Sequence, residues 1–97
     1  MRGLLLAWLV EVHIKFKLLP ETLFITVNLI DRFTERVVVK RNEYQLVGVT
    51  AMLIASKYEE IHPPVVADFE YITDNCYTRQ QILQQEFLML QTLGFDI

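Results

Sequence analysis

Cysteine, glycine and proline are scarce in this chain of 97 residues, and basic residues do not outnumber acidic ones. Cys76 is the single cysteine, so no disulfide can form within the chain and no Cys/His set has zinc-ligand spacing. A lone thiol fits a reducing compartment, the cytosol or the nucleus. Three glycines, three prolines and a hydrophobic content of 53% exclude collagen-like and disordered chains. We therefore expect one folded domain spanning residues 1–97.

Charge and apolar run length exclude two classes of partner. Nine basic residues against 12 acidic ones give a net charge of −3, so the basic footprint of a nucleic-acid-binding protein is missing. The longest apolar runs, residues 3–10 and 46–55, are far shorter than the roughly 18 residues that suggest a membrane span. We therefore expect no nucleic acid and no membrane as a partner.

Breaks in the pattern predict five helices and no sheet. The expected helices cover residues 1–17, 20–33, 42–59, 65–72 and 78 to just before 94. The signals at their ends are Pro20 in a first turn, Asn42 with Gln45 as a cap, the break at Pro63-Pro64, a capping box from Thr78 to Gln81, and Gly94 as the stop. The β-branched run Val37–Val39 has no strand partner and is expected to be an inward-packing connector.

The helix expected at 42–59 is apolar on nearly every side. A helix that is hydrophobic all round is buried. Gly48, Ala51 and Ala55 are small, so neighbouring helices can approach it closely. The predicted fold class is therefore all-α, a five-helix bundle with this helix at its centre.

The first helix carries more apolar surface than one packing face needs. At about 100° per residue, two stripes form roughly 120° apart. The first stripe contains Met1, Leu4, Leu5, Trp8 and Val12, and the second contains Leu6, Leu9, Val10 and Phe16. Either both stripes are core, or one packs on the central helix and the other is an open docking groove.

Two charges interrupt apolar faces. Lys57 projects to the side of its helix that carries Leu53, and Glu86 projects between Ile82 and Leu90 on the last helix. A buried unpaired charge costs several kcal/mol. If the two apolar faces meet, Lys57 and Glu86 could form an ion pair and reduce this cost. The alternative is that Lys57 extends into solvent at its helix end, where the helix dipole favours a cation, and that Glu86 lies at a helix edge.

Residues for catalysis are missing. His13 and His62 lack metal-ligand spacing, and Cys76 lies in a turn without a local histidine. No glycine-rich phosphate loop is present. The acidic pairs Glu59-Glu60 and Asp31 with Glu35 are expected to be solvated charges at helix ends. These features favour a binding module over an enzyme, with no metal and no cofactor.

Several ordered segments resemble the cyclin box, most closely that of mitotic cyclins of the B type, with the A type next. They are Met1-Arg2-x-x-Leu5-x-x-Trp8-Leu9-Val10-Glu11-Val12, Asp31-Arg32-Phe33, Leu46 to Glu60, Pro63-Pro64, Asp68-Phe69-x-Tyr71-Ile72-Thr73-Asp74 and Tyr77-Thr78. The resemblance covers the whole chain and implies the N-terminal cyclin box. The second box and the N-terminal degradation region are expected to be absent, which leaves open a truncated cyclin without full activating ability.

The resemblance implies a regulatory subunit that binds and activates a cyclin-dependent kinase in G2/M control. Such cyclins bind beside the mobile αC helix of the kinase and do no chemistry themselves. The family is expected in the nucleus and the cytoplasm. An alternative is a cyclin-fold module that serves as a scaffold in transcription, against which the acidic charge balance and the Lys57/Glu86 pair argue.

The resemblance also assigns two surfaces. The kinase interface would contain Lys57, Glu86, Ile54, Tyr58, Leu90, Phe95 and Ile97. A patch that docks substrates or inhibitors bearing an Arg-x-Leu motif would contain Met1, Leu4, Leu5, Trp8, Glu11, Arg41, Tyr44 and Gln45. Glu11 would meet the basic residue of the ligand, since an apolar groove with an acid at its edge suits a basic-plus-leucine peptide. Tyr44 departs from the leucine that is usual at this patch.

Overall fold

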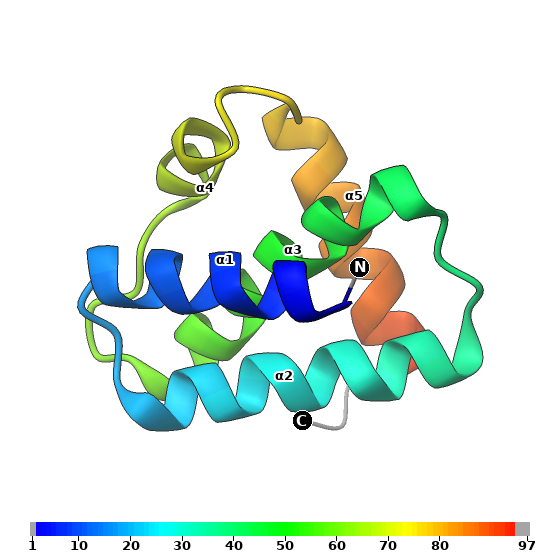
Figure 1. The fold of residues 1–97 in the computed structure, drawn as a ribbon, viewed down its shortest axis with the longest axis horizontal. Helices are drawn as coiled ribbons and strands as arrows, with labels where there is room; N and C mark the ends of the chain where they lie inside the picture. The colour runs from blue at the N-terminus through cyan, green and yellow to red at the C-terminus, as the bar shows by residue number, and fades with distance from the viewer. Residues whose placement is uncertain (1, 95–97) are drawn as a thin grey trace.

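The chain forms helices joined by short turns. The computed structural model describes residues 2–94, with the side chains from residue 7 onward except that of Arg41. The elements are α1 (Arg2–Lys15), α2 (Pro20–Arg36), the 3-10 turn η1 (Arg41–Glu43), α3 (Tyr44–Glu59), α4 (Val66–Ile72) and α5 (Arg79–Thr92). Over this part of the chain the all-α prediction is confirmed (Figure 1). The radius of gyration is 12.0 Å.

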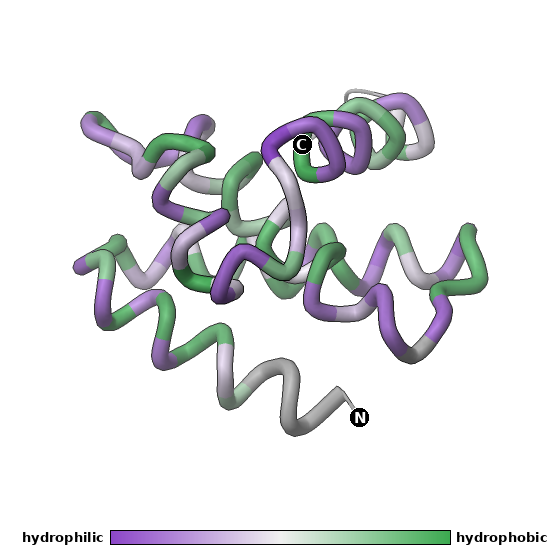
Figure 2. The backbone as a smooth tube through the Cα atoms, turned by 90° about the horizontal axis from the view of Figure 1, so that it is seen from above, coloured by the Kyte–Doolittle hydropathy of each residue, from purple (hydrophilic) through white to green (hydrophobic). Residues whose placement is uncertain are grey.

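Helix α3 is the centre of the domain. Each of the other four α-helices packs against it. Helices α1 and α5 lie on opposite sides of the molecule (Figure 2). Every residue from Val47 to Ser56 is buried, as the all-round apolar pattern predicts. The buried hydroxyl of Thr50 donates to the carbonyl of Leu46 at 2.7 Å, and that of Ser56 donates to Met52, so neither is left without a partner.

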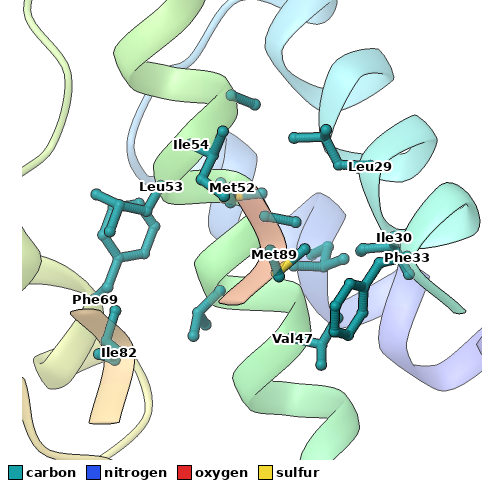
Figure 3. Packing of buried hydrophobic residues seen from close by; sticks show 14 of the residues in the cluster. Leu29, Ile30, Phe33, Val47, Met52, Leu53, Ile54, Phe69, Ile82 and Met89 are labelled. Carbon is teal, nitrogen blue, oxygen red and sulfur yellow. The ribbon is translucent and has the colours of Figure 1, made fainter. Parts of the chain in front are cut away.

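Two groups of side chains fill the space around α3 (Figure 3). On one side Phe69 of α4 and Ile82 of α5, both fully buried, lie beside Leu53. On the other side Phe33 of α2 lies beside Val47, and both are 1% exposed. The α3 helix therefore joins the α1–α2 pair to the α4–α5 pair.

The helix ends follow the sequence signals in most places. Pro20 occupies the first turn of α2, and the Thr78 hydroxyl accepts a hydrogen bond from the backbone N–H of Gln81 at the start of α5. After α5, Gly94 has a φ of +69°, the left-handed conformation that glycine adopts without strain. The prediction that Asn42 caps α3 is wrong, because the 3-10 turn η1 occupies that position.

The connector between α2 and η1 is neither helix nor strand, as predicted. Its inward packing is confirmed only for alternate residues. Val37 and Val39 pack against the core, whereas Val38 is 96% exposed. An extended segment points successive side chains to opposite sides, so one of the three has to face solvent.

The inward face of α1 differs from both predicted stripes. Leu9 of the second stripe and Val12 of the first are buried, at 0% and 2% exposed, while Val10 is 40% exposed. Trp8 and Phe16 pack against the same core. The core-facing side of α1 therefore runs between the two stripes and takes residues from each of them.

A carboxylate at the end of α3 also binds the start of α2. Oε2 of Glu60 accepts a hydrogen bond of 2.7 Å from the backbone N–H of Leu19 and a second one from the hydroxyl of Thr22. Leu19 is the N-cap residue of α2 and has no side-chain oxygen to cap it. The expectation that Glu60 is merely solvated is therefore wrong.

Candidate functional site

Lys57 and Glu86 form an ion pair between the last turn of α3 and the middle of α5. Nζ of Lys57 lies 2.7 Å from Oε2 of Glu86. Helices α3 and α5 pack directly on each other, which brings together residues 29 positions apart in the sequence. The structure therefore combines parts of both arrangements that the pattern allowed, because Lys57 pairs with Glu86 and its side chain still reaches solvent.

The pair is half open to solvent. The side chain of Lys57 is 49% exposed and that of Glu86 is 13% exposed. The expectation of a buried charge is therefore wrong for Lys57, because it lies in the last turn of α3, where a long side chain can keep its ammonium in solvent. An exposed ion pair of this kind contributes little to folding, typically about 0–1 kcal/mol.

Apolar residues lie close to each member of the pair along its helix. Tyr58, which follows Lys57, is 63% exposed, and Leu90 of α5 is half-buried. Ile54 is only 3% exposed and packs in the core, so its effect on this surface is indirect. The predicted contacts Phe95 and Ile97 lie outside the described residues.

Sequence reasoning missed an apolar stripe on α5. Leu83 and Phe87 are 36% and 61% exposed and line one hollow together with Arg79. The spacing of four residues between them was the available signal, because it places all three on one face of a helix. This stripe and the Lys57–Glu86 pair lie on the same helix, so α5 presents both charge and apolar area.

The predicted docking patch is described in part. Trp8 and Tyr44 are half-buried against the core, Gln45 is half-buried, and Glu11 is exposed. Met1, Leu4, Leu5 and Arg41 lie outside the described side chains. Helix α1, which carries Trp8 and Glu11, packs against α3, which begins with Tyr44 and Gln45.

The titratable side chains of the described residues do not gather into a metal site, since no group of three His, Cys, Asp or Glu is placed to hold an ion. Nε2 of His13 lies 2.8 Å from the carbonyl oxygen of Leu19. This hydrogen bond joins α1 to the start of α2, which is a structural role. None of the helices described is long and apolar enough to cross a membrane.

An all-α domain that displays an ion pair among exposed apolar side chains has the features of a protein-binding module. The family model described as "Cyclin, N-terminal domain" matches residues 1–97. The chain therefore belongs to the cyclin family.

Individual relatives agree with this assignment. Cyclin-B2-1 of Oryza sativa subsp. japonica is 58% identical over all 97 residues, which are 23% of that protein. G2/mitotic-specific cyclin-B of Arbacia punctulata is also 58% identical over the whole chain, which is 24% of its length. The chain thus spans about a quarter of the curated relatives that it matches.

A solved structure has the same fold. The X-ray structure of a viral cyclin from herpesvirus saimiri matches with a TM-score of 0.92 at 26% sequence identity. The match covers 98% of this chain and 42% of the viral one. The central position of α3 is therefore the arrangement of the cyclin-box fold, as the resemblance implied.

Proposed function

We propose that the chain is the kinase-binding domain of a mitotic cyclin, a regulatory subunit that binds a cyclin-dependent kinase and acts in the nucleus and the cytoplasm. It performs no catalysis of its own. The Lys57–Glu86 pair and the apolar residues Tyr58 and Leu90 form the centre of the contact. Cyclin family membership and the mitotic cyclin names of its relatives support this role.

The observation that carries the proposal is an ion pair in which the carboxylate is mostly buried and the ammonium is half exposed. Glu86 is 13% exposed and fixes Lys57, whose ammonium keeps donors that the single bond to Glu86 does not use. A partner that covers the exposed half of Lys57 would have to supply acceptors such as backbone carbonyls. The exposed apolar area of Tyr58, at 63%, would then be removed from water.

The mechanism is a shift in the conformational equilibrium of the kinase. A binding partner changes such an equilibrium only if it binds one state more tightly than the other. The contact beside αC of the kinase is the place where this preference would arise, since active kinases need αC and its glutamate in position. The cyclin domain contributes a rigid surface for this purpose, because α3 and α5 are held by a shared core.

Binding to a purified cyclin-dependent kinase tests the proposal. Lys57→Ala and Glu86→Ala should each weaken binding by more than about 2 kcal/mol, because each strands a charge that the complex buries. Lys40→Ala is the matched control, since Lys40 is exposed just before η1 at the other end of the central helix. Unchanged affinity in both pair variants would refute the interface.

Activation is a separate property from binding. The co-purified complex should phosphorylate a kinase substrate faster than the kinase alone. Binding without activation would identify the chain as a cyclin domain that binds the kinase but does not shift its conformational equilibrium toward the active state. This is the truncated-cyclin alternative. The same assay therefore distinguishes the two possibilities.

We also propose that Trp8, Glu11, Tyr44 and Gln45 belong to a docking patch for Arg-x-Leu peptides. An exposed acid beside half-buried aromatic side chains suits a ligand with one basic and one aliphatic residue. Trp8 is the only tryptophan in the chain, so its fluorescence should change when such a peptide binds. Glu11→Gln should weaken binding of the Arg-x-Leu peptide and leave binding of an Ala-x-Leu peptide unaltered. Equal binding of both peptides to the unmodified chain would refute the patch.

A further inference from the structure

Arg79 is a cation in a position where the helix dipole opposes it. It is the first residue of α5, and the first turn of that helix contains no acidic residue. Helix N-termini favour anions and disfavour cations by about 0.3–1 kcal/mol. Within the described part of the chain, Arg79 makes no hydrogen bond or ion pair, and it is exposed. No described residue therefore offsets the unfavourable position of its charge.

Two surface hollows meet at Arg79. The first, named the Lys57 hollow, has a volume of about 390 Å³ and is lined by Leu53, Lys57, Pro63–Ala67 and Arg79. The second, named the α5 hollow, has a volume of about 730 Å³ and is lined by Arg79, Gln80, Leu83, Gln84 and Phe87. Because Arg79 belongs to both, a segment that crosses the start of α5 meets it between two apolar areas.

Each hollow has exposed apolar side chains in its wall. Val65 is 62% exposed at the rim of the Lys57 hollow, and Phe87 is 61% exposed in the α5 hollow. Isolated apolar side chains on a surface are ordinary, but these flank one cation on both sides. The arrangement suits a ligand that is apolar at each end and charged in the middle.

Two charged residues on the elements that form the Lys57 hollow already have partners. Lys57 is paired with Glu86 at 2.7 Å. The carboxylate of Asp68, at the start of α4, accepts a hydrogen bond of 3.1 Å from the backbone N–H of Val65. Of the two charged residues that line these hollows, Lys57 and Arg79, only Arg79 has no hydrogen bond or ion pair with another described residue.

We infer that the kinase contact extends from the Lys57–Glu86 pair across the Lys57 hollow to Arg79, where it receives a carboxylate of the kinase flanked by aliphatic side chains. The inference rests on the proposed function and names a further contact of the same surface. A carboxylate matches the single charge of Arg79 and its fork of donors. A phosphate, at about −1.5 to −2 charges, would call for more cations than the hollow supplies.

The test measures the affinity for a purified cyclin-dependent kinase as a function of salt concentration. Arg79→Gln should weaken binding about three- to tenfold and make the affinity less sensitive to salt, because one cross-interface charge pair is lost. Arg79→Glu should weaken it further, since it places two carboxylates together. Lys40→Gln, which removes a distant exposed cation, is the matched control for net charge.

Folding effects are separated by a thermal melt of each variant. Arg79→Gln should leave the melting temperature unchanged or slightly raise it, because it removes a cation from a helix N-terminus. Weaker kinase binding at an undiminished melting temperature supports the inference. The inference is overturned if Arg79→Gln and the unmodified chain have equal affinity and equal salt dependence. If Lys57→Ala still weakens binding in that case, the proposed function stands and only the extension to Arg79 fails. Failure of the unmodified chain to bind any kinase would instead overturn the proposed function and this extension together.

Discussion

Oε2 of Glu60, one residue beyond α3, accepts a hydrogen bond from the backbone N–H of Leu19 at a distance of 2.7 Å, 41 positions earlier in the chain. The same oxygen accepts from the hydroxyl of Thr22, which is fully buried. A carboxylate near a helix N-terminus is favoured by the exposed N–H groups there. Glu60 thus supplies for α2 the cap that Leu19 cannot supply.

Glu60→Ala should lower the free energy of unfolding by about 1–3 kcal/mol, because it leaves the buried hydroxyl of Thr22 without an acceptor. Urea denaturation monitored by circular dichroism measures the change. Glu59→Ala is the matched control, since Glu59 is the neighbouring glutamate and takes no part in this contact. Equal losses in the two variants would show that Glu60 does not cap α2.

Removal of the Lys57–Glu86 pair should barely affect folding. With Lys57 49% exposed, we expect Lys57→Ala to change the free energy of unfolding by less than about 1 kcal/mol. The exchanged pair Lys57→Glu with Glu86→Lys should fold normally and still fail to bind the kinase. Normal kinase binding by the exchanged pair would mean that the partner does not recognise the orientation of the two charges.

The contact of α4 with the rest of the domain depends on Phe69. This side chain is fully buried and its ring lies edge-on to that of Phe16, with 5.4 Å between centroids. Phe69→Ala should cost about 3–5 kcal/mol because it opens a cavity beside Leu53. Ile82→Val, at another fully buried position of the same group, should cost only about 0.5–1.5 kcal/mol.

Amide hydrogen exchange of Phe69→Ala, compared with that of the unmodified chain, shows which helices lose protection. The fastest new exchange in Phe69→Ala is expected in α4, whose seven residues provide few other contacts. Uniform loss of protection across α2 and α4 alike would contradict a local role for Phe69.

Stability should fall at alkaline pH through Tyr77. Its hydroxyl donates to the carbonyl of Asn42 at 3.2 Å, and burial, followed by the nearby Cys76, raises the pKa of the phenol above its usual 10.0. The folded state then holds the proton more tightly than the unfolded chain. The stabilisation is complete below pH 10.0 and is lost as the pH rises through the folded pKa.

Melting temperatures measured on both sides of pH 10 test this dependence. Tyr77→Phe should be less stable at neutral pH by about 0.5–1.5 kcal/mol and should show a shallower alkaline decline. Tyr58→Phe, which alters a phenol 63% exposed, is the control. The same alkaline decline in Tyr77→Phe and the unmodified chain would contradict the assignment.

Much of the fold could be predicted from the sequence because its signals are local. Pro20, the Thr78–Gln81 capping box and Gly94 mark helix ends, and the apolar run within α3 indicates its central position. The pairing of Lys57 with Glu86 was one of two options, since pattern alone does not say which faces meet. The packing of α3 on α5 decides between them.

The features that sequence could not predict depend on contacts between distant segments. Nothing near Glu60 in the sequence indicates that Leu19 lies beside it. The mixed inward face of α1 follows from how that helix rotates against α3, which a helical projection of a single segment does not determine. The sequence offered the exposure of Lys57 as one of two options, but that the residue is both exposed and paired follows only from the packing of α3 on α5.

The change from burial to exposure along α3 occurs within a single step, from Ser56 at 0% exposed to Lys57. This step separates a buried stretch, Val47 to Ser56, which contacts only the rest of the domain, from a final turn whose side chains reach solvent. Substitutions within the buried stretch would change how much folded protein exists. Under the proposed function, substitutions in the last turn would instead change kinase binding, so folded amount and partner affinity can vary independently on one helix.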